Sequence, residues 1–386
     1  MTSRETKKIA VIMGTRPEAI KLAPVIKELE TAERLTPLVV STDQHREMLL
    51  QVVETFDIGI TVNLDIMQPD QSLAALSARL LQGLDSWLER AAPDMLVVQG
   101  DTTTVLIAAL AAFYRRIPLA YVEAGLRTGN MYSPFPEEAN RRLATPLMAL
   151  YFAPTAEAHQ NLLAEGIDDK RITVTGNTVI DALQMESRRQ EAADIRRHII
   201  YGQLAGVIAP DWQERPYVLI TGHRRENFGA GFRQICRGLL TLAARFKDIR
   251  FIYPLHLNPN VQHPVQELMG EASNIFLIPP QGYPQFVALM KHCRLILTDS
   301  GGVQEEASSL GKPVLVMRDT TERPEGVKSG IVKLVGARAD SIVRETTELL
   351  LNPAAYEKMS RRANPYGDGR ASGRIVEAIT RFFYES

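Results

Sequence analysis

Short apolar runs alternate with amphipathic, helix-like stretches along most of the chain. Lys8–Met13, Leu38–Ser41, Met95–Val98 and Leu119–Val122 have the composition of strands that are buried on both faces. Helix-like segments lie between them, bounded by turn-forming residues. Strands that alternate with helices in this way form a parallel sheet covered on both faces. The pattern therefore predicts an α/β fold.

The alternation is interrupted once and then restarts. A long polar helix is expected from Thr178 to about Gly202, and an irregular stretch precedes the next strand at Tyr217–Thr221. A length of 386 residues suits two domains of ordinary size. We therefore predict two doubly wound, Rossmann-like domains whose parallel sheets face a cleft. Because the last helix can return to the first domain, the expected domains are 1–178 with 371–386, and 179–370.

The bulk composition is that of a soluble globular protein, with 45% hydrophobic and 23% charged residues. A formal net charge of −1 supplies no general attraction to nucleic acid or to an anionic membrane. No run of about 18 apolar residues is present, and the polar N-terminus has no apolar signal core. The two cysteines suit a reducing compartment. We expect a cytoplasmic protein with no nucleic-acid or membrane partner.

An apolar run from Leu295 leads into a turn with the features of an anion site. Ser300 can cap the helix that follows, by accepting a bond from a free backbone N–H. Gly301 and Gly302 leave the backbone open at the first helical turn, where free N–H groups and the helix dipole favour a phosphate. Glu306, one to two turns further on, can accept both hydroxyls of a ribose. A capped turn without a ligand is the simpler alternative.

Two other segments of the second half can complete a nucleotide site. In Pro279–Phe286, the backbone at Gln281 and the ring of Phe286 can hold and stack a flat base, unless Phe286 belongs to the core. Arg323 follows the strand near Val314 and offers a planar, two-donor fork for a diphosphate or a ribose. With the preceding turn, these residues suit a phosphate, a ribose and a base.

Charged residues also follow the strands of the first half. Arg16 and Lys21 begin the helix after the first strand and can reach an anion, although Lys21 is equally explained as a solvated surface lysine. Asp101, Glu123 and Glu137 come at or just after strand ends. Carboxylates that share a site can supply both an acid and a base. Helix capping by Asp101, and a favourable helix start at Glu137, are the simpler explanations.

One histidine stands out from the other six. His223 follows a strand and adjoins Arg224 and Arg225, so it is cationic enough to face a pyrophosphate and to donate a proton. A loop histidine without function is the alternative. Ligands of open parallel sheets bind beyond the carboxyl ends of the strands, so the expected site is the cleft between the two sheets. No His-Glu-x-x-His or comparable spacing occurs, and we expect no metal site.

Short motifs occur in order along nearly the whole chain. They are Gly14–Lys21, Gln44–Met48, Gly100–Thr104, Val122–Gly129, Pro136–Arg141, Thr175–Asp181, Thr221–Glu226, Thr298–Gly302, Arg318–Glu325 and Asn364–Gly369. Together they strongly resemble the motifs of the non-hydrolysing UDP-N-acetylglucosamine 2-epimerases of bacteria. Each motif alone is weak, whereas the combination is highly specific.

The resemblance implies a glycosyltransferase-B-like fold and the interconversion of UDP-GlcNAc and UDP-ManNAc, without a metal or nicotinamide cofactor. The C2 proton of the sugar is too weakly acidic for direct exchange. The family instead eliminates UDP across C1–C2, which leaves a 2-acetamidoglucal, and UDP then adds back while a proton reaches the opposite face. Family members make UDP-ManNAc for cell-surface polysaccharides and usually act as homodimers.

The resemblance also implies roles for the residues that match its motifs. Asp101, Glu123 and Glu137 match the acid/base and sugar-site carboxylates. His223 matches the group that stabilises or protonates the leaving UDP, and Arg16 and Lys21 match further residues of the first domain. The residues that match contacts to uracil, diphosphate and ribose are Gln281, Phe286, Ser300, Gly301, Gly302, Glu306 and Arg323.

The chain departs from the family pattern at two places. Gln99 stands where many relatives have a histidine. In some relatives a second UDP-GlcNAc binds beside the first and activates the enzyme, in a pocket that includes residues matching Gln44 and His45. Glu47 and Gln71 stand at further positions of that pocket, and the added negative charge disfavours a second diphosphate. Allosteric activation is therefore left open and is not expected.

Other functions share these features. A retaining glycosyltransferase of the same architecture would share the UDP-binding half but would need a cleft for an acceptor. An epimerase that acts on a modified UDP-GlcNAc would share both halves. A hydrolysing epimerase usually has a different first loop, and a nucleotide-sugar sensor would bind its ligand without turnover.

Overall fold

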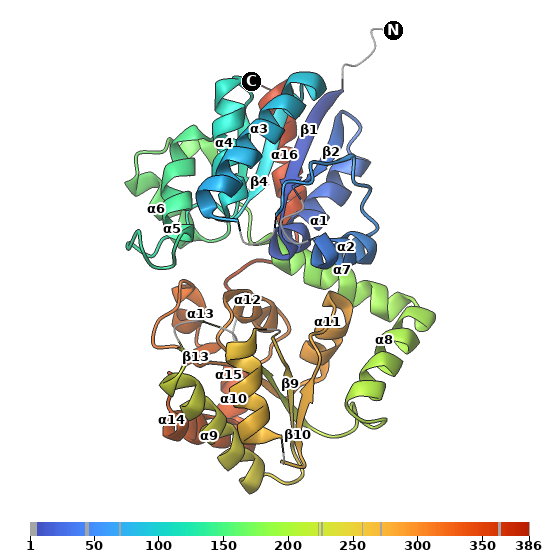
Figure 1. Cartoon of the computed structure of the whole chain (residues 1–386), viewed down its shortest axis with the longest axis vertical. Helices are drawn as coiled ribbons and strands as arrows, with labels where there is room; N and C mark the ends of the chain where they lie inside the picture. Colours follow the sequence, from blue (N-terminus) through green and yellow to red (C-terminus); the bar gives the residue numbers. More distant parts are fainter. Residues whose placement is uncertain are drawn as a thin grey trace. The chain divides into compact units, whose positions relative to one another are not determined.

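The computed structural model describes residues 6–42, 46–68, 71–222, 224, 227–256, 258–270, 272–361 and 364–385, with the backbone alone at 46–48, 259, 260 and 264. The chain forms two compact units, Met1–Met185 with Tyr366–Ser386, and Glu186–Pro365. Figure 1 shows their helices and strands, coloured along the sequence. The expected boundaries at 178 and 371 differ from these by a few residues, because Val179 and Ile180 pack against Tyr366.

The first unit is built on a parallel sheet, whose seven described strands lie in the order β3-β2-β1-β4-β5-β6-β7. In the centre, Val11 pairs with Val39 on one side and with Val97 on the other. Both central strands are buried on both faces, which explains their unbroken apolar sequence. The strands are β1 (Lys7–Met13), β2 (Leu35–Ser41), β3 (Val62–Asn63), β4 (Met95–Gln99), β5 (Leu119–Val122), β6 (Leu150–Ala153) and β7 (Ile172–Val174).

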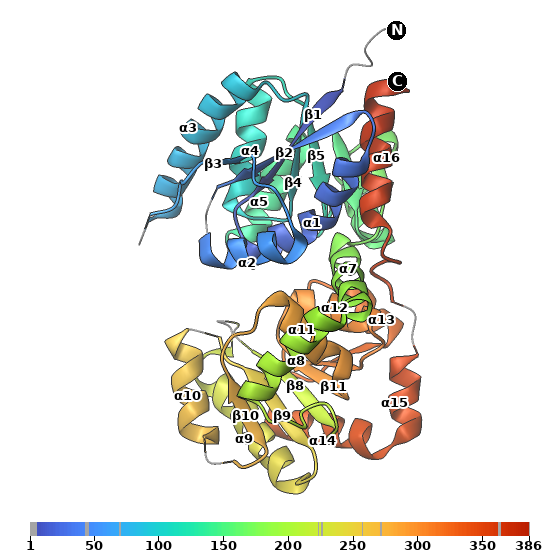
Figure 2. The same cartoon turned by 90° about the vertical axis from the view of Figure 1, so that its right-hand side faces the viewer.

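Helices cover both faces of this sheet. Figures 1 and 2 show α3 and α4 on one face and α1 and α16 on the other. The last helix, α16, belongs to this unit as expected, since it packs against α1 and Tyr384 Oη donates to the carbonyl oxygen of Arg34 at 3.0 Å. The helices are α1 (Arg16–Thr31), α2 (Arg46–Phe56), α3 (Leu73–Ala91), α4 (Thr103–Tyr114), α5 (Glu137–Ala144), α6 (Ala156–Ala164), the start of α7 (Thr178–Ala192) and α16 (Ala371–Tyr384).

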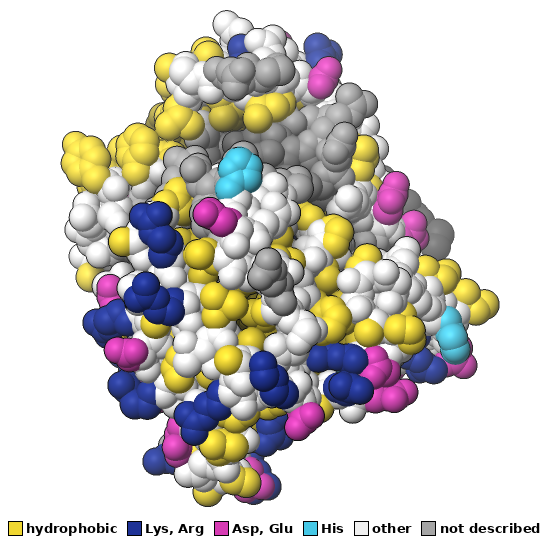
Figure 3. Space-filling view, turned by 60° about the horizontal axis from the view of Figure 1, so that its bottom comes forward, with side chains coloured by type: hydrophobic (Ala, Val, Ile, Leu, Met, Phe, Trp, Pro, Cys, Tyr) yellow, Lys and Arg dark blue, Asp and Glu magenta, His cyan; other side chains and the backbone are white. Residues whose placement is uncertain are grey.

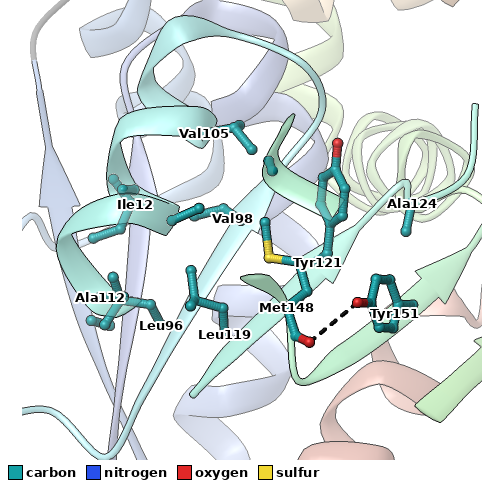
Figure 4. Close-up of a cluster of buried hydrophobic side chains, with 14 of the residues drawn as sticks. Ile12, Leu96, Val98, Val105, Ala112, Leu119, Tyr121, Ala124, Met148 and Tyr151 are labelled. Carbon is teal, nitrogen blue, oxygen red and sulfur yellow. Dashed lines mark hydrogen bonds between the residues drawn. The ribbon is translucent and has the colours of Figure 1, made fainter. Parts of the chain in front are cut away.

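Apolar side chains from β1, β4, β5 and α4 form the core of the first unit (Figure 4). Two buried tyrosines place their hydroxyls on backbone carbonyls. Tyr151 Oη donates to the oxygen of Met148 at 3.2 Å, and Tyr121 Oη donates to the oxygen of Gly100 at 2.7 Å. Burial raises the pKa of the Tyr121 hydroxyl, so this group remains a donor. The Tyr121 bond ties the core to the turn that follows β4.

The second unit repeats this architecture with six described strands, in the order β10-β9-β8-β11-β12-β13. All the recorded pairings are parallel; in the centre, Leu297 pairs with Ile220 on one side and with Leu315 on the other. The predicted class of two doubly wound parallel sheets is confirmed. The strands are β8 (Tyr217–Thr221), β9 (Arg250–Pro254), β10 (Ile275–Ile278), β11 (Leu295–Thr298), β12 (Val314–Val316) and β13 (Val332–Leu334).

The helices of the second unit connect these strands. Apolar residues of α9 and α14 pack on β8, β9 and β11 and form its core. The helices that follow α7 are α8 (Asp194–Val207), α9 (Ala230–Arg245), α10 (Pro259–Met269), α11 (Tyr283–His292), α12 (Gly301–Ser309), α13 (Pro324–Ser329), α14 (Ala339–Leu351) and α15 (Pro353–Ser360).

The long polar helix expected from Thr178 to about Gly202 is two helices, and that prediction was wrong. The chain is extended at Ala193, which separates α7 from α8. Across the break, Arg196 Nη2 lies 2.7 Å from Glu186 Oε2, and the Glu186 side chain is fully buried. This ion pair is a tertiary contact that helix propensity does not report.

Surface charge is mixed. Figure 3 shows one face on which Lys and Arg side chains are interspersed with Asp and Glu, in keeping with the net charge of −1. Across the described ranges of the chain, no helix is both long and apolar enough to cross a membrane. The same ranges contain no cluster of three or more His, Cys, Asp or Glu side chains suited to a metal ion.

Candidate active site

The site in the first unit begins at the carboxyl ends of β4 and β5. These strands are neighbours, with Gln99 opposite Val122, so the residues that follow them lie together. Gly100 and Glu123 both have left-handed backbones, with φ of 83° and 64°. That conformation is uncommon for a glutamate and turns the chain sharply at the end of the strand. The strand-end position predicted for Glu123 is therefore reached through a strained backbone.

Glu123 is a buried carboxylate surrounded by donors. Lys21 Nζ lies 2.6 and 2.7 Å from its two oxygens. Asn177 Nδ2 donates to Oε1 at 3.0 Å, and the side-chain amide of Gln99 donates to Oε2. The side chains of Glu123 and Lys21 are 5% and 10% exposed, so the pair is shielded from water. Lys21 is thus a buried partner of Glu123 and not the solvated lysine of the alternative reading.

The start of α1 positions Lys21 and Arg16. Thr15 and Glu18 form a capping box, in which Glu18 Oε2 accepts from the backbone N–H of Thr15 at 2.7 Å; it also accepts from the backbone N–H of Gly14 at 2.8 Å. Burial raises the pKa of Glu18, and four hydrogen bonds oppose that effect. Arg16 is the first residue of α1 and is half-buried. The turn that carries it is held at both ends by buried hydrogen bonds.

Asp101 does not cap a helix, which removes the simpler explanation for it. Thr102 caps α4, and its Oγ1 accepts from the backbone N–H of Val105 at 3.4 Å. Asp101 instead forms an ion pair, because Arg141 Nη2 and Nε donate to its Oδ2 at 2.6 and 3.1 Å. Asn140 Nδ2 donates to its backbone oxygen at 2.8 Å. Two residues of α5 therefore hold Asp101.

Glu137 is the first residue of α5, as predicted. It shares a face of this helix with Arg141, four positions further on. Because Arg141 contacts Asp101, Glu137 lies on the side of α5 that faces the end of β4. One of its carboxylate oxygens, Oε2, is buried without a hydrogen-bond partner. An unpaired buried oxygen is costly unless it is protonated or meets a ligand.

In the second unit, the expected strand, turn and helix from Leu295 are confirmed as β11 and α12. The prediction that the Ser300 side chain caps α12 was wrong, because that side chain makes no capping hydrogen bond. Its backbone N–H donates to Thr298 Oγ1 at 2.9 Å, which fixes the turn. Ser300, the residue at the N-cap of α12, thus leaves the start of the helix without a capping bond from its own side chain, and such a helix start is suited to an anion.

Arg323 lies over this helix start. A Cβ added to Gly301 would be 2.5 Å from Arg323 Nη1, so the guanidinium occupies the space beside the glycine. Arg323 Nε donates to Glu305 Oε1 at 2.6 Å, which fixes the side chain. A Cβ at Gly302 would meet no described atom within 4 Å, so the first turn is open there. The structure brings Ser300, Gly301, Gly302 and Arg323 together.

Glu306 and its partner lie near the same turn. Glu306 is buried, and Tyr283 Oη donates to its Oε1 at 2.9 Å. Tyr283 begins α11, and Phe286 follows one turn later, half-buried and outside the described core cluster. The alternative that Phe286 is core is therefore not supported. Gln281 is half-buried in the preceding loop, and its side chain donates to the oxygen of Pro279 at 2.7 Å.

Some predicted residues fall outside the described residues. His223, Gln44 and His45 are among them, and of Glu47 only the backbone is described. Three residues whose contacts are described above were not predicted as site residues from the sequence: Arg141 and Asn177 in the first unit, and Tyr283 in the second. Each lies within a segment that the sequence had singled out, but its role depends on a contact with a distant residue.

The fold and these two groups of residues define a two-domain α/β enzyme of glycosyltransferase-B-like architecture. A family model described as UDP-N-acetylglucosamine 2-epimerase matches residues 27–380. The chain is 52% identical over 378 residues to a probable UDP-N-acetylglucosamine 2-epimerase of Ralstonia nicotianae, covering 98% of the chain and 100% of the relative. It is 52% identical over 372 residues to the Escherichia coli K12 UDP-N-acetylglucosamine 2-epimerase, covering 96% and 98%.

A solved structure agrees with these matches. The crystal structure of UDP-GlcNAc 2-epimerase from Neisseria meningitidis bound to UDP-GlcNAc superposes with a TM-score of 0.91. It is 49% identical in sequence, and the match covers 97% of this chain and 100% of that one. The chain belongs to the UDP-N-acetylglucosamine 2-epimerase family, a family of isomerases, and the resemblance of its motifs is confirmed.

Proposed function

We propose that this chain interconverts UDP-GlcNAc and UDP-ManNAc by reversing the configuration at C2 of the sugar. One observation carries the proposal: the chain is similar over nearly its whole length to a Neisseria meningitidis enzyme whose crystal structure contains UDP-GlcNAc. The arrangement of charge supports it, since the buried Glu123 and the partly buried Asp101 follow neighbouring strands in the first unit, and a helix start without a capping bond from Ser300 lies beside Arg323 in the second.

The reaction is proposed to proceed by elimination and re-addition of UDP. The C2 hydrogen has no adjacent carbonyl group to stabilise a carbanion, so direct deprotonation is too slow. Loss of UDP across C1–C2 leaves 2-acetamidoglucal, and UDP returns while a proton arrives at C2 from the opposite face. The diphosphate that leaves must stay bound. The N–H groups at Gly301 and Gly302, with Arg323, are the groups proposed to hold it.

Glu306 and Phe286 are proposed to bind the rest of the nucleotide. The Glu306 carboxylate can accept the two ribose hydroxyls, and its bond from Tyr283 fixes its orientation. The half-buried ring of Phe286 and the backbone at Gln281 are proposed to contact the uracil. Ser300 is proposed to add its hydroxyl to the diphosphate site, because no capping bond engages it.

The first unit is proposed to act on the sugar. Asp101, Glu123 and Glu137 supply the acid and base groups around C2 and the 3-hydroxyl, which is the general acid–base catalysis that this reaction needs. Lys21 fixes the position of the Glu123 carboxylate through its two short contacts. Arg16 and His223 are proposed to face the diphosphate, where a cation stabilises the leaving group.

The physiological role is proposed to be the supply of UDP-ManNAc for cell-surface polysaccharides. We further propose that the enzyme acts in the cytoplasm as a homodimer, without a metal or nicotinamide cofactor. Size-exclusion chromatography with light scattering tests the dimer, and activity after treatment with a chelator tests independence from metals.

A proton NMR time course with UDP-GlcNAc in deuterated water tests the proposed reaction. We expect UDP-ManNAc to appear without any acceptor, with deuterium at C2 of both sugars, because the proton is exchanged with solvent during each turnover. Transfer of the sugar only when an acceptor is supplied would indicate a glycosyltransferase. Release of free ManNAc and UDP would indicate the hydrolysing reaction. Tight binding without exchange at C2 would indicate a sensor.

A further inference from the structure

Arg141 is a buried arginine between two carboxylates of the first unit. Its Nη2 and Nε donate to Asp101 Oδ2 at 2.6 and 3.1 Å, and its Nη1 donates to Glu138 Oε2 at 3.0 Å. The Arg141 side chain is 6% exposed and the Glu138 side chain is fully buried. Burial opposes the charge of Arg141, but Asp101 and Glu138 raise its pKa above the usual arginine value.

Glu138 fixes the other side of this arginine. Its carboxylate also accepts the backbone N–H groups of Thr128 and Gly129, at 3.1 and 3.3 Å. A buried charge is stable only when its hydrogen-bonding capacity is met, and here the loop at 128–129 and α5 meet it together. The Arg141 guanidinium is therefore fixed on this side by the buried and hydrogen-bonded carboxylate of Glu138. Arg141 is thus a rigid support for whatever it contacts on its other side.

On its other side Arg141 contacts Asp101, and it contacts only one of the two oxygens of that carboxylate. Both Arg141 donors reach Oδ2, whereas Oδ1 has no hydrogen bond to any described residue. Asn140, the neighbour of Arg141 on α5, holds the backbone oxygen of Asp101 at 2.8 Å. The Asp101 side chain is 29% exposed, although its partner is buried. One oxygen is committed to the arginine, and the other remains available to a ligand.

We propose that Arg141 is a positioning residue of the epimerase reaction, which fixes the Asp101 carboxylate through Oδ2 and leaves Oδ1 as the oxygen that meets the substrate. The proposal rests on the proposed function, because it assigns a task to a carboxylate of that reaction. Arg141 touches no reacting atom. Its contribution is to orient the Asp101 carboxylate, so that loss of Arg141 misplaces this carboxylate and slows turnover while substrate binding is kept.

The chain contains a matched ion pair that serves as a control. Arg250 Nη2 lies 2.6 Å from Asp211 Oδ1, and the two side chains are 10% and 35% exposed. The distance between Arg141 and Asp101 is also 2.6 Å, and their side chains are 6% and 29% exposed. Arg250 is the first residue of β9, at the end of the strand opposite to the one where ligands bind in parallel sheets. Loss of Arg250 removes a similar partly buried ion pair without touching the proposed site.

The experiment compares Arg141→Ala, Arg141→Lys and Arg250→Ala with the native chain. Turnover and KM are measured with UDP-GlcNAc, with and without added guanidinium at a concentration that leaves the unfolding transition unchanged. We expect Arg141→Ala to lower kcat on the order of 100-fold, to change KM by less than about threefold, and to regain part of its kcat with guanidinium. Arg141→Lys keeps the charge but loses the planar fork, so we expect an intermediate kcat without rescue.

Arg250→Ala is expected to lose stability, with kcat near the native value and no response to guanidinium. A native kcat in both Arg141 variants would overturn the proposal. A second result would also overturn it: Arg141→Ala loses activity only in proportion to its unfolded fraction and is not rescued by guanidinium, while Arg141→Lys has the native rate. If Arg141→Ala does not fold, Arg141→Lys decides alone. A kcat below the native value supports the proposal, and a native kcat overturns it. A native chain without epimerase activity would instead refute the proposed function.

Discussion

The two units arrange their charged groups differently beyond the ends of their strands. In the first unit, Glu123 and Asp101 are each paired with a cation, Lys21 and Arg141 respectively. In the second unit, a helix start without a side-chain cap lies beside an arginine, and Tyr283 supports an acceptor for hydroxyl groups. The first arrangement suits proton transfer at neutral carbon, and the second suits the retention of an anion that leaves and returns.

In the reaction proposed above, the two units have different tasks. A carboxylate that takes a proton from a weakly acidic position must be placed accurately. A leaving diphosphate needs donors that stay in place throughout the reaction. Chemistry and retention are therefore predicted to respond to different substitutions.

The largest effect is expected from the carboxylates of the first unit. Glu123→Gln and Asp101→Asn should each lower kcat by at least about 100-fold, because loss of a general acid or base commonly costs that much. The affinity for UDP, measured by calorimetry, should stay within about threefold of the native value, since no UDP contact is proposed for either residue. Near-native turnover in both variants would refute their assigned roles.

A buried ion pair of the second unit should affect stability in place of chemistry. Arg318 Nη1 and Nη2 donate to the Glu322 carboxylate at 2.9 and 3.2 Å. Burial opposes ionisation, but the hydrogen bonds and charge of Arg318 lower the pKa of Glu322 to about 2. Because the folded-state pKa lies below the unfolded value, the pair stabilises the fold above about pH 4.5 and loses that effect as the pH falls toward 2.

Glu322→Gln should therefore cost at most about 3.5 kcal/mol of unfolding free energy at pH 7, since each unit of pKa shift corresponds to about 1.4 kcal/mol. The variant should also lose less stability than the native chain between about pH 4.5 and pH 2. Chemical denaturation across this range measures both quantities. Identical pH dependence in the two chains would contradict the assigned ion pair.

A smaller effect, on binding, is expected at the start of α12. Gly301→Ala places a Cβ 2.5 Å from Arg323 Nη1, so the guanidinium must shift from its contact with the buried Glu305. We expect the affinity for UDP to fall about tenfold, or about 1.4 kcal/mol, together with a loss of stability from the displaced ion pair. Gly373→Ala, early in α16, is the control, because its Cβ meets no described atom within 4 Å. Equal affinities in the two variants would argue against a diphosphate site here.

The smallest effect is expected from Tyr283→Phe. This change removes the hydrogen bond to Glu306 Oε1 and leaves the ring in place. One hydrogen bond to a charged partner is worth about 1–2 kcal/mol, and the carboxylate can still turn toward a ribose. We therefore expect the affinity for UDP to fall by about three- to tenfold, with a smaller loss for deoxyuridine diphosphate. A change in kcat without a change in affinity would indicate a different role.

The architecture of the chain was largely predictable from its sequence, because burial on both faces leaves a continuous apolar signal in strands such as β1 and β4. The short strand β3 was missed, since its two residues, Val62 and Asn63, carry no such signal. The break at Ala193 was missed because an ion pair to Glu186, and not a glycine or proline, holds it.

The site residues that could be predicted from the sequence are those whose place is set by the end of a strand. Glu123 and Asp101 follow parallel strands, and that is a local signal. Their partners are not local: Lys21 lies 102 residues from Glu123, and Arg141 lies 40 residues from Asp101. The absence of a capping bond from the Ser300 side chain is a different kind of miss, because the turn there is ordered by a local bond from the Ser300 backbone N–H to Thr298 Oγ1.

The division of labour between the units is tested most directly by a crystal structure of the protein with UDP. The account predicts diphosphate oxygens within hydrogen-bonding distance of the backbone N–H groups of Gly301 and Gly302 and of the Arg323 guanidinium, with the ribose on Glu306. A nucleotide bound instead beside Glu123 and Lys21, with the start of α12 unoccupied, would contradict it.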